Sequence, residues 1–357
     1  MAKILYAAGT YGHISCFHIE YINALRSEGH EVLVMAKGEG ADFNIPFEKK
    51  MLSLNNLKTW KKIKKIVKEE NFDVILLNTT LAAFNIRMAL GKKRPRVVNF
   101  VHGYMFPENP KGLKNKIFLF VEKFFRKKTD AIMVMNEADF RIANKYKLTR
   151  GEIAMTRGMG AELKATVASA EEIRASLNSK DRYAICFVGE LCSAKNQELL
   201  IRILPKLKES IPNVVLWLPG AGVLENELKK LAKELSVEDS VRFPGYVNNP
   251  TDYVRAADIY ISPSKKEGLP FNVLEALGAT KPIIVSNVKG HFDLIDDGVT
   301  GFLFDKNSPE ELIVKIKVLH SGEVFVNTDK QKETFNKYSR SEVFDETLSI
   351  MKSLMNV

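Results

Sequence analysis

Long hydrophobic runs and cysteines are scarce in this chain of 357 residues, and each scarcity argues against a class of protein. No apolar run approaches the ~20 residues that a membrane-spanning helix requires. The three cysteines, Cys16, Cys186 and Cys192, lack metal-ligand spacing and cannot all pair with one another, which favours a reducing compartment. The first residues lead directly into an apolar stretch without signal-peptide features, so we expect a cytoplasmic protein.

The fingerprint of a dinucleotide-binding protein is missing as well. The turn after the first expected strand reads Gly-Thr-Tyr-Gly-His at residues 9–13, which is not Gly-x-Gly-x-x-Gly. The second expected strand ends at Lys37, where an NAD site places an acidic residue. NAD binding is therefore disfavoured, although the glycines of the turn still allow close approach of the backbone to another ligand.

Positive charge is present in excess, and it is unevenly distributed. The net charge is +10, yet residues 1–160 hold 28 Lys and Arg against 15 Asp and Glu, while the remainder holds 25 against 28. Such asymmetry indicates that the first half faces an anionic surface or ligand. No helix-turn-helix, zinc-finger or RNA-recognition pattern accompanies the charge, so nucleic acid is not expected as a partner.

Two basic stretches carry apolar residues at helical spacing. Residues 60–68 place apolar side chains at 60, 63, 66 and 67, and residues 111–128 set four phenylalanines among lysines and arginines. A basic amphipathic helix can lie in an anionic membrane interface, where each cation contributes ~1 kcal/mol. The alternative is ordinary packing on a sheet with solvated lysines. The two interpretations are balanced for 60–68, whereas the aromatic residues of 111–128 favour a membrane surface.

Short apolar strands alternate with amphipathic helices in both halves, as in α/β proteins with parallel sheets. Strands are predicted near residues 3–8, 31–36, 73–78, 96–101 and 131–135, and then near 183–188, 213–218, 241–243, 258–262, 282–286 and 301–304. Two similar tandem units imply two Rossmann-like domains, at 1–160 and 161–338, with their parallel sheets facing across a cleft.

The most informative stretch is residues 264–276, which read Ser-Lys-Lys-Glu-Gly-Leu-Pro-Phe-Asn-Val-Leu-Glu-Ala directly after an expected strand. Ligands bind at the carboxyl edge of strands in an open α/β sheet, and a new helix N-terminus there can hold phosphate. Glu267 and Glu275 would accept hydrogen bonds from the hydroxyls of a sugar or ribose beside a diphosphate. The alternative is a helix cap and one solvated glutamate.

The string Ser-x-x-Glu-Gly-x-Pro, with Glu275 eight positions after Glu267, resembles the donor-site signature of retaining family 4 glycosyltransferases, which have the GT-B fold. The resemblance implies that Glu267 contacts the donor sugar and matters for turnover, and that Glu275 holds the nucleotide ribose. It also implies that the last residues, 339–357, form a helix crossing back to the first domain. The donor diphosphate would be held by the backbone of Gly268, Leu269, Pro270 and Phe271.

The segment 187–196 supplies a second part of this resemblance. Family members carry Gly-Arg-Leu here with a lysine five residues after the arginine, and Lys195 matches that lysine. By resemblance Lys195 neutralises the diphosphate during catalysis; the plain alternative is a solvated lysine at a helix start. Glu190 replaces the arginine, and its charge opposes phosphate. It either turns away and orients Lys195 or recognises a sugar hydroxyl, and the Gly-Glu-Leu form resembles the exopolysaccharide and capsule branch.

Further residues are assigned by position. His102, in the Val-His-Gly element after the fourth strand, resembles the histidine that positions the donor sugar; a capping or core histidine is the alternative. Tyr246 lies in the loop that touches the nucleobase in this family, where uridine is the common partner. His18 is expected to be structural, and His291 is left unassigned. The loop beside the diphosphate and acceptor would comprise Thr10, Tyr11, Gly12 and His13, with Gly12 also on the donor side.

These expectations combine into a retaining transferase that moves a sugar from a nucleotide-sugar, with UDP as the expected nucleotide. The acceptor would be a glycan or a polyprenyl-diphosphate-linked sugar, handled peripherally on the inner face of the cell membrane during bacterial surface polysaccharide synthesis. No Asp-x-Asp pair occurs, so neither a metal nor another cofactor is expected. Two alternatives remain: a GT-B nucleotide-sugar 2-epimerase, or a non-catalytic GT-B subunit of a membrane transferase complex.

Overall fold

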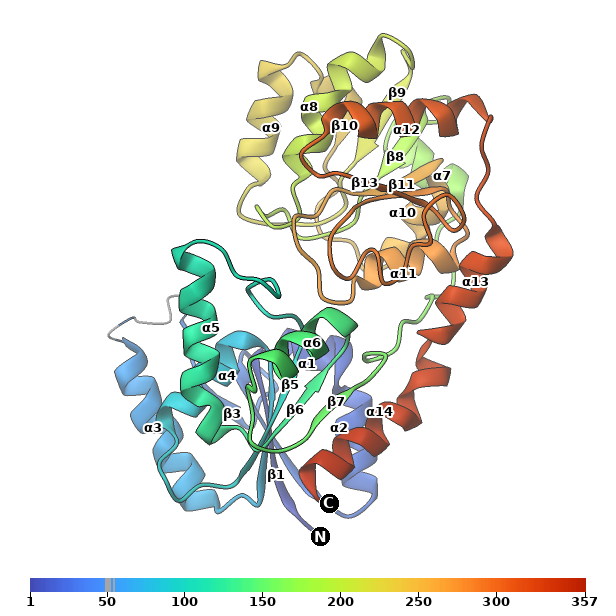
Figure 1. Cartoon of the computed structure of the whole chain (residues 1–357). Coiled ribbons are helices and arrows are strands. Elements are labelled where there is room, and N and C mark those ends of the chain that lie inside the picture. Colours follow the sequence, from blue (N-terminus) through green and yellow to red (C-terminus); the bar gives the residue numbers. More distant parts are fainter. Residues whose placement is uncertain (49–52, 54) are drawn as a thin grey trace. The chain divides into compact units, whose positions relative to one another are not determined.

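The computed structural model describes residues 1–48, 53 and 55–357 of the chain. These residues form two compact units, one made of residues 1–160 with 341–357 and the other of residues 161–340 (Figure 1). Each unit is built around its own parallel β-sheet, as the sequence predicted. No helix within the described ranges is both long and apolar enough to cross a bilayer.

The sheet of the first unit has the strand order β3-β2-β1-β4-β5-β6-β7 across the described residues. Its strands are β1 (Lys3–Thr10), β2 (Glu31–Lys37), β3 (Phe43–Asn44), β4 (Val74–Asn78), β5 (Arg96–Val101), β6 (Ala131–Val134) and β7 (Ile153–Met155). Every residue of β4 is buried, as expected for a central strand covered on both faces. The edge strands β3 and β7 are additions that the sequence analysis did not predict.

The helices of this unit cover its sheet. They are α1 (Tyr11–Phe17), α2 (Ile19–Ser27), α3 (Asn55–Glu70), α4 (Thr80–Ala89), α5 (Leu113–Phe125), a 3₁₀ turn (Arg126–Lys128), α6 (Glu137–Lys145) and α14 (Arg340–Met355). The basic stretch 60–68 lies in α3, where Ile63 is fully buried and Trp60 packs against the same core. Trp60 Nε1 also donates to Asn85 Oδ1 at 2.8 Å. This stretch therefore packs on the core of the first unit, as one of its two interpretations predicted.

The C-terminal residues 341–357 belong to the first unit, although they follow the second one in the chain. Figure 1 shows α14, in red, beside α2. The rings of Tyr21 and Phe344 lie 4.5 Å apart between centroids, and Thr347 Oγ1 donates to the carbonyl of Gly158 at 2.8 Å. Arg96 Nε donates to Leu354 O at 2.7 Å, which ties the end of α14 to β5.

The second unit has the strand order β10-β9-β8-β11-β12-β13. Its strands are β8 (Tyr183–Cys186), β9 (Val214–Trp217), β10 (Val241–Arg242), β11 (Ile259–Ser262), β12 (Ile283–Ser286) and β13 (Phe302–Phe304). Its helices are α7 (Ala170–Ser176), α8 (Gln197–Lys208), α9 (Glu225–Glu234), a 3₁₀ turn (Glu238–Ser240), α10 (Pro250–Ala256), α11 (Phe271–Gly278), α12 (Pro309–Ser321) and α13 (Thr328–Lys337). The order reverses between β8 and β11, and ligands bind beyond the carboxyl ends of strands at such a point.

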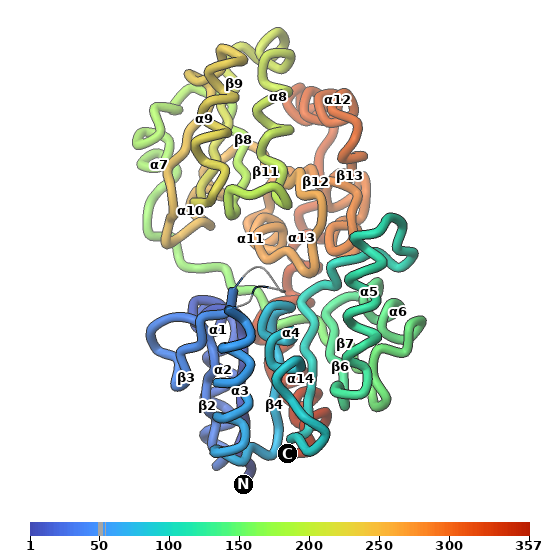
Figure 2. Tube along the Cα trace, turned by 90° about the vertical axis from the view of Figure 1, so that its left-hand side faces the viewer, coloured from blue at the N-terminus to red at the C-terminus, as the bar shows by residue number. Residues whose placement is uncertain are grey.

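One buried ion pair fastens α5 to α4 in the first unit; Figure 2 shows both helices from the side. Arg87 Nη1 and Nη2 donate to the two carboxylate oxygens of Glu122 at 2.9 and 3.0 Å. The Arg87 side chain is 1% exposed, and its guanidinium lies 4.5 Å from the ring centroid of Phe125. A bidentate, hydrogen-bonded pair is the arrangement that tolerates burial of both charges.

The substitution Glu122→Ala should destabilise the first unit by about 3–5 kcal/mol, because it leaves the Arg87 guanidinium buried without its partner. Urea unfolding of the variant and the native chain measures the change. Glu69→Ala removes an exposed partner of Lys65 on α3 and serves as the control, with an expected change below about 1 kcal/mol. Equal effects of the two substitutions would contradict the role given to the buried pair.

Candidate functional site

Lys195 and Glu267 form an ion pair at the point where the strand order of the second unit reverses. Lys195 Nζ donates to Glu267 Oε1 at 2.7 Å, and the two side chains are only 23% and 11% exposed. The backbone N–H of Lys265 donates to Ala194 O at 2.8 Å, so the loops after β8 and β11 are joined twice. The structure thus brings together two residues that the sequence analysis selected separately.

Glu190 does not take part in this pair. It is exposed, and its carbonyl oxygen accepts a hydrogen bond from Gln197 Nε2 at 2.9 Å. Among the described residues, the carboxylate that orients Lys195 is Glu267. Of the two roles considered for Glu190, the orientation of Lys195 is therefore not what the structure shows.

Glu275 lies on α11, where it is partly buried. Burial raises the pKa of its carboxyl from the usual 4.5 to about 7, while the positive charges of Lys164 and Arg255 act in the opposite direction. Arg255 Nη2 donates to the carbonyl of Lys164 at 2.9 Å, which keeps the two cationic residues together. Such a carboxyl can accept hydrogen bonds from ligand hydroxyls when ionised and donate one when protonated.

The loop from Gly268 to the start of α11 packs closely against the turn at Gly290. Leu269 and Pro270 are buried, whereas Phe271, the first residue of α11, is partly exposed. Gly290 has a φ of +84°, and a Cβ placed on it would lie 2.5 Å from the carbonyl oxygen of Gly268. A glycine is therefore required at 290, because any side chain there would collide with the Gly268 carbonyl.

His291, which the sequence analysis left unassigned, supports this loop from the core. Its ring is fully buried, with Nδ1 2.8 Å from Ser286 O and Nε2 3.2 Å from Ser262 Oγ. Burial lowers the pKa of His291 to about 4, so the ring is neutral near pH 7. We assign His291 the structural task of joining the ends of β11 and β12.

Tyr246 follows a turn that contacts the rest of this edge through backbone. Gly220 N donates to Gly245 O at 2.8 Å, and a Cβ on Gly220 would lie only 2.0 Å from Gly189 O. The loops after β8, β9 and β10 are thus in close backbone contact. The Tyr246 side chain itself is 78% exposed.

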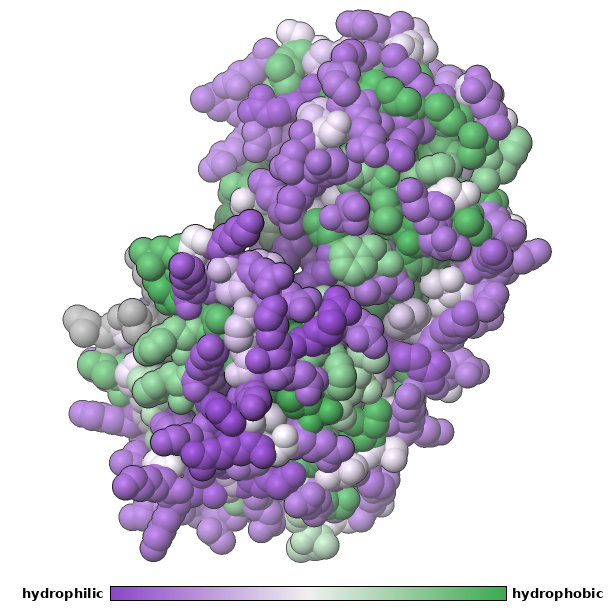
Figure 3. Space-filling view, viewed as in Figure 1, coloured by the Kyte–Doolittle hydropathy of each residue, from purple (hydrophilic) through white to green (hydrophobic). Residues whose placement is uncertain are grey.

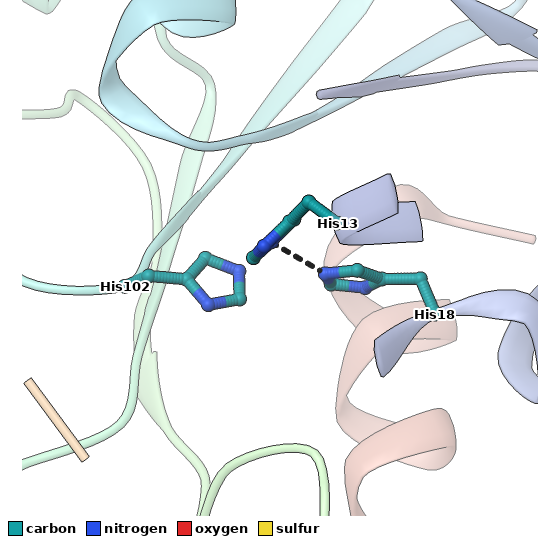
Figure 4. Close-up of side chains that lie close together, drawn as sticks. All are labelled: His13, His18 and His102. Carbon is teal, nitrogen blue, oxygen red and sulfur yellow. Dashed lines mark hydrogen bonds between the residues drawn. The ribbon is translucent and has the colours of Figure 1, made fainter. Parts of the chain in front are cut away.

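The first unit gathers three histidines at the carboxyl edge of its sheet (Figure 4). His13 comes from α1, His18 from the break between α1 and α2, and His102 directly follows β5. His13 Nε2 and His18 Nε2 are 3.1 Å apart, and the His102 ring centroid lies 5.1 and 5.3 Å from those of His13 and His18. The sequence analysis selected His13 and His102 but not this cluster.

All three imidazoles are neutral near pH 7. Burial lowers the pKa of His13 to about 4 and that of His102 to about 3, and it lowers the pKa of His18 well below its ordinary value. In a neutral imidazole one nitrogen donates a hydrogen bond and the other accepts one. The ring carries no charge with which to attract an anion.

The rest of the loop that contains His13 is open. Thr10 ends β1 and caps α1, its Oγ1 accepting from His13 N at 3.4 Å. Gly12 is exposed, and a Cβ placed on it would contact nothing within 4 Å. The ring of Tyr11 lies against Gly40, where a Cβ would come within 2.4 Å of it. The loop therefore presents backbone, as a ligand-contacting loop requires.

Comparison with protein families agrees with this division into two units. The model described as Glycosyltransferase Family 4 matches residues 19–156, and the model described as Glycosyl transferases group 1 matches residues 169–342. Two Rossmann-like units that match these two models place the chain among the sugar-transferring enzymes. The chain belongs to the group 1 and family 4 glycosyltransferases, which confirms the family predicted from residues 264–276.

Several curated relatives span most of the chain. EpsD of Bacillus subtilis, named as a glycosyltransferase, is 27% identical over 99% of this chain and 97% of that protein. An uncharacterised glycosyltransferase of Methanocaldococcus jannaschii is 30% identical over 72% of this chain and 68% of that protein. The UDP-Gal:α-D-GlcNAc-diphosphoundecaprenol α-1,3-galactosyltransferase of Escherichia coli is 24% identical over 81% of this chain and 75% of that protein.

Solved structures share the fold of this chain. Anabaena HepE in complex with UDP-glucose matches 99% of this chain and 100% of its own length, with a TM-score of 0.79 and 17% sequence identity. Together with the two parallel sheets, this likeness confirms the GT-B fold class that the sequence predicted.

The raised pKa of Glu275 makes stability depend on pH. Because the folded chain holds this proton more tightly than the unfolded chain, ionisation of Glu275 above about pH 7 opposes folding. At pH values well above 7, Glu275→Gln should therefore raise the Tm. The gain should vanish below about pH 4.5, where native Glu275 is protonated in both the folded and the unfolded chain. Scanning calorimetry measures it, with the exposed Glu234→Gln as control. A gain independent of pH would contradict the assignment.

Proposed function

We propose that this glycosyltransferase takes its sugar from a UDP-sugar and transfers it with retention of configuration, without a metal ion, to a lipid-linked or glycan acceptor. The observation that carries the proposal is the Lys195–Glu267 ion pair. Glu267 lies in the loop after β11, and Glu275 follows it on α11. Two named proteins support it: HepE was solved with UDP-glucose, and the E. coli relative is named for a UDP-sugar donor and a diphosphoundecaprenol-linked acceptor.

In this proposal each group has one task in the second unit. Lys195 supplies the cation for the donor diphosphate, in the place where other transferases use a metal ion. Glu267 accepts hydrogen bonds from the donor sugar, and Glu275 accepts them from the ribose. The exposed Tyr246 borders the nucleobase, and the turn at Gly268–Phe271 faces the phosphates with its backbone.

The first unit would handle the sugar and the acceptor. His102, neutral through burial, positions the donor sugar through a hydrogen bond and does not act as a base. The open loop Thr10–His13 borders the acceptor. The leaving diphosphate takes the proton of the attacking hydroxyl as the new glycosidic bond forms on the face from which the diphosphate departs.

UDP should stabilise the native protein in a chelator-containing buffer. Free ligand at 100 times its dissociation constant adds about 2.7 kcal/mol of stability, which a thermal-shift measurement resolves. Lys195→Ala should weaken UDP binding roughly 10- to 100-fold, because a hydrogen bond from a charged group contributes about 1.5–3 kcal/mol. Lys230→Ala, on the exposed face of α9, is the control and should bind UDP normally.

UDP release from each UDP-sugar tests the proposed transfer against the two alternatives, a 2-epimerase and a non-catalytic subunit. Release that depends on an added lipid-linked acceptor supports the transferase. Conversion of a UDP-sugar to its 2-epimer without any acceptor would assign the chain to the 2-epimerase class, and the absence of UDP binding under all conditions would assign it to a non-catalytic subunit. A strict requirement for Mg²⁺ or Mn²⁺ would overturn the metal-independent part of the proposal.

We also propose that α5 places the enzyme on the inner face of the cell membrane. Four large apolar side chains follow one another on α5 at helical spacing, and all are more than half exposed: Leu113 77%, Ile117 51%, Phe120 68% and Phe124 59%. Figure 3 shows hydrophobic side chains gathered beside the upper end of this helix.

Charge and packing support the same surface. Lys114, Lys116 and Lys123 lie on α5 beside the apolar stripe, and all three are exposed. The opposite side of the helix holds it on the sheet, through Phe125 and the buried Glu122. Insertion of apolar side chains together with attraction to anionic lipids is how an interfacial helix binds.

The double substitution Phe120→Ser with Phe124→Ser should reduce binding to anionic lipid vesicles by at least about 100-fold, since burying each phenylalanine contributes about 1.5–3 kcal/mol. Co-sedimentation with vesicles of phosphatidylglycerol measures it. Phe325→Ser alters an 81% exposed phenylalanine of the second unit and should leave binding unchanged. Vesicle binding that survives the double substitution would overturn the assignment of α5.

A further inference from the structure

The three histidines at the edge of the first sheet converge through their ring nitrogens. One nitrogen from each of His13, His18 and His102 lies within 4.8 Å of the other two. The closest pair, His13 Nε2 and His18 Nε2, is 3.1 Å apart. Nitrogens bound to one tetrahedral ion at about 2.0–2.1 Å stand roughly 3.3–3.4 Å apart, so modest side-chain rotation would complete that geometry.

Tyr6 fixes the orientation of the most buried ring. Its hydroxyl lies 2.8 Å from His18 Nδ1, and both residues are fully buried. When His18 Nδ1 carries the proton and donates to Tyr6, the lone pair of Nε2 points into the cluster. Histidine ligands of metals characteristically donate their second ring nitrogen to such a partner, which sets the tautomer.

His102 supplies an independent indication of a ligand. Its Nε2 is buried and has no hydrogen-bond partner within the part of the chain that the structure describes. A buried polar nitrogen left unpaired costs about 1–3 kcal/mol, and native structures contain few of them. Figure 4 shows the His102 ring facing the other two rings. A group that accepts this lone pair would remove the cost.

We propose that His13, His18 and His102 form a binding site for a transition-metal dication of the Zn²⁺ class. Three imidazole nitrogens are a ligand set that suits Zn²⁺, Co²⁺, Ni²⁺ and Cu²⁺, whereas Mg²⁺ and Ca²⁺ require oxygen ligands. His13 is partly exposed, so the fourth position is filled by water or by a ligand from solution. The site lies within the first unit, and metal binding there does not depend on the proposed transfer reaction, whereas the inhibitory role described next rests on it.

The role that fits this site is inhibition rather than catalysis. His102 and His13 are the residues to which the proposed function assigns the donor sugar and the acceptor loop. A metal ion that holds both imidazoles occupies the nitrogens that would meet the substrates. Transfer therefore proceeds in the metal-free protein, and Zn²⁺ competes with it.

The test uses the full-length protein without a histidine tag, treated with chelator and then dialysed. Calorimetric titration with ZnCl₂ should show one ion per chain, and CoCl₂ should give the visible absorption of tetrahedral Co²⁺. His13→Ala should weaken Zn²⁺ binding at least 10-fold. Tyr6→Phe keeps all three ligands and removes the hydrogen bond to His18, with an expected loss of about 10- to 100-fold. His320→Ala, an exposed histidine of the second unit, is the control and should change nothing.

Each other result decides against the site. If Zn²⁺ binds the native protein and His13→Ala equally well, the ion sits elsewhere. If neither metal binds while circular dichroism shows folded protein, the contact between His13 and His18 is an ordinary N–H···N hydrogen bond, and the proposal is wrong. UDP binding to the same samples is measured separately, because loss of UDP binding bears on the proposed function and not on the histidine cluster.

Discussion

Parallel pairing between strands that lie far apart in the sequence is the constraint on which both candidate sites depend. β8 pairs with β11, and β1 pairs with β4, in sheets whose strand order reverses at those contacts. Because parallel strands end at the same edge, the loops that follow them meet there. The Lys195–Glu267 contact results from the first pairing, and the bond from Gly9 N to Thr79 Oγ1, 2.9 Å long, results from the second.

The two edges differ in their electrostatics. In the second unit a cation and a carboxylate neutralise each other directly, and Glu275 lies within the influence of two further cations. In the first unit the polar groups are buried imidazoles, which burial keeps uncharged. In the proposed function the charged edge meets the donor diphosphate and the uncharged edge meets hydroxyl groups, and in the further inference the uncharged edge holds a metal ion that accepts nitrogen lone pairs.

Much of the fold could be predicted because the strands of parallel sheets are apolar runs separated by helical repeats. β3 and β7 were missed because two and three residues are too few to show any periodicity. The stretch 60–68 was ambiguous because a basic amphipathic helix looks the same on a sheet as on a membrane. Its burial against the core depends on neighbours such as Asn85, which local sequence does not reveal.

The candidate sites were predictable residue by residue but not as arrangements. Glu267 and Lys195 could be selected from motifs, yet their ion pair depends on the order of strands in the sheet. One alternative was that Glu190 orients Lys195, but the structure pairs Lys195 with Glu267. Residues that are close in sequence need not be close in space. Likewise His102 and His13 were selected separately from the sequence. Only the structure, which brings the end of β5 to α1, shows that they form a cluster with His18.

The ion pair between Lys195 and Glu267 has a consequence for the order of events in the proposed function. Lys195 Nζ and Glu267 Oε1 satisfy each other in the structure, so this carboxylate oxygen is already engaged. A diphosphate can draw the ammonium away, and only then is the carboxylate released for sugar hydroxyls. In the proposed function the pair would therefore couple the two ends of the donor, because binding of the phosphate end would free the carboxylate for the sugar end.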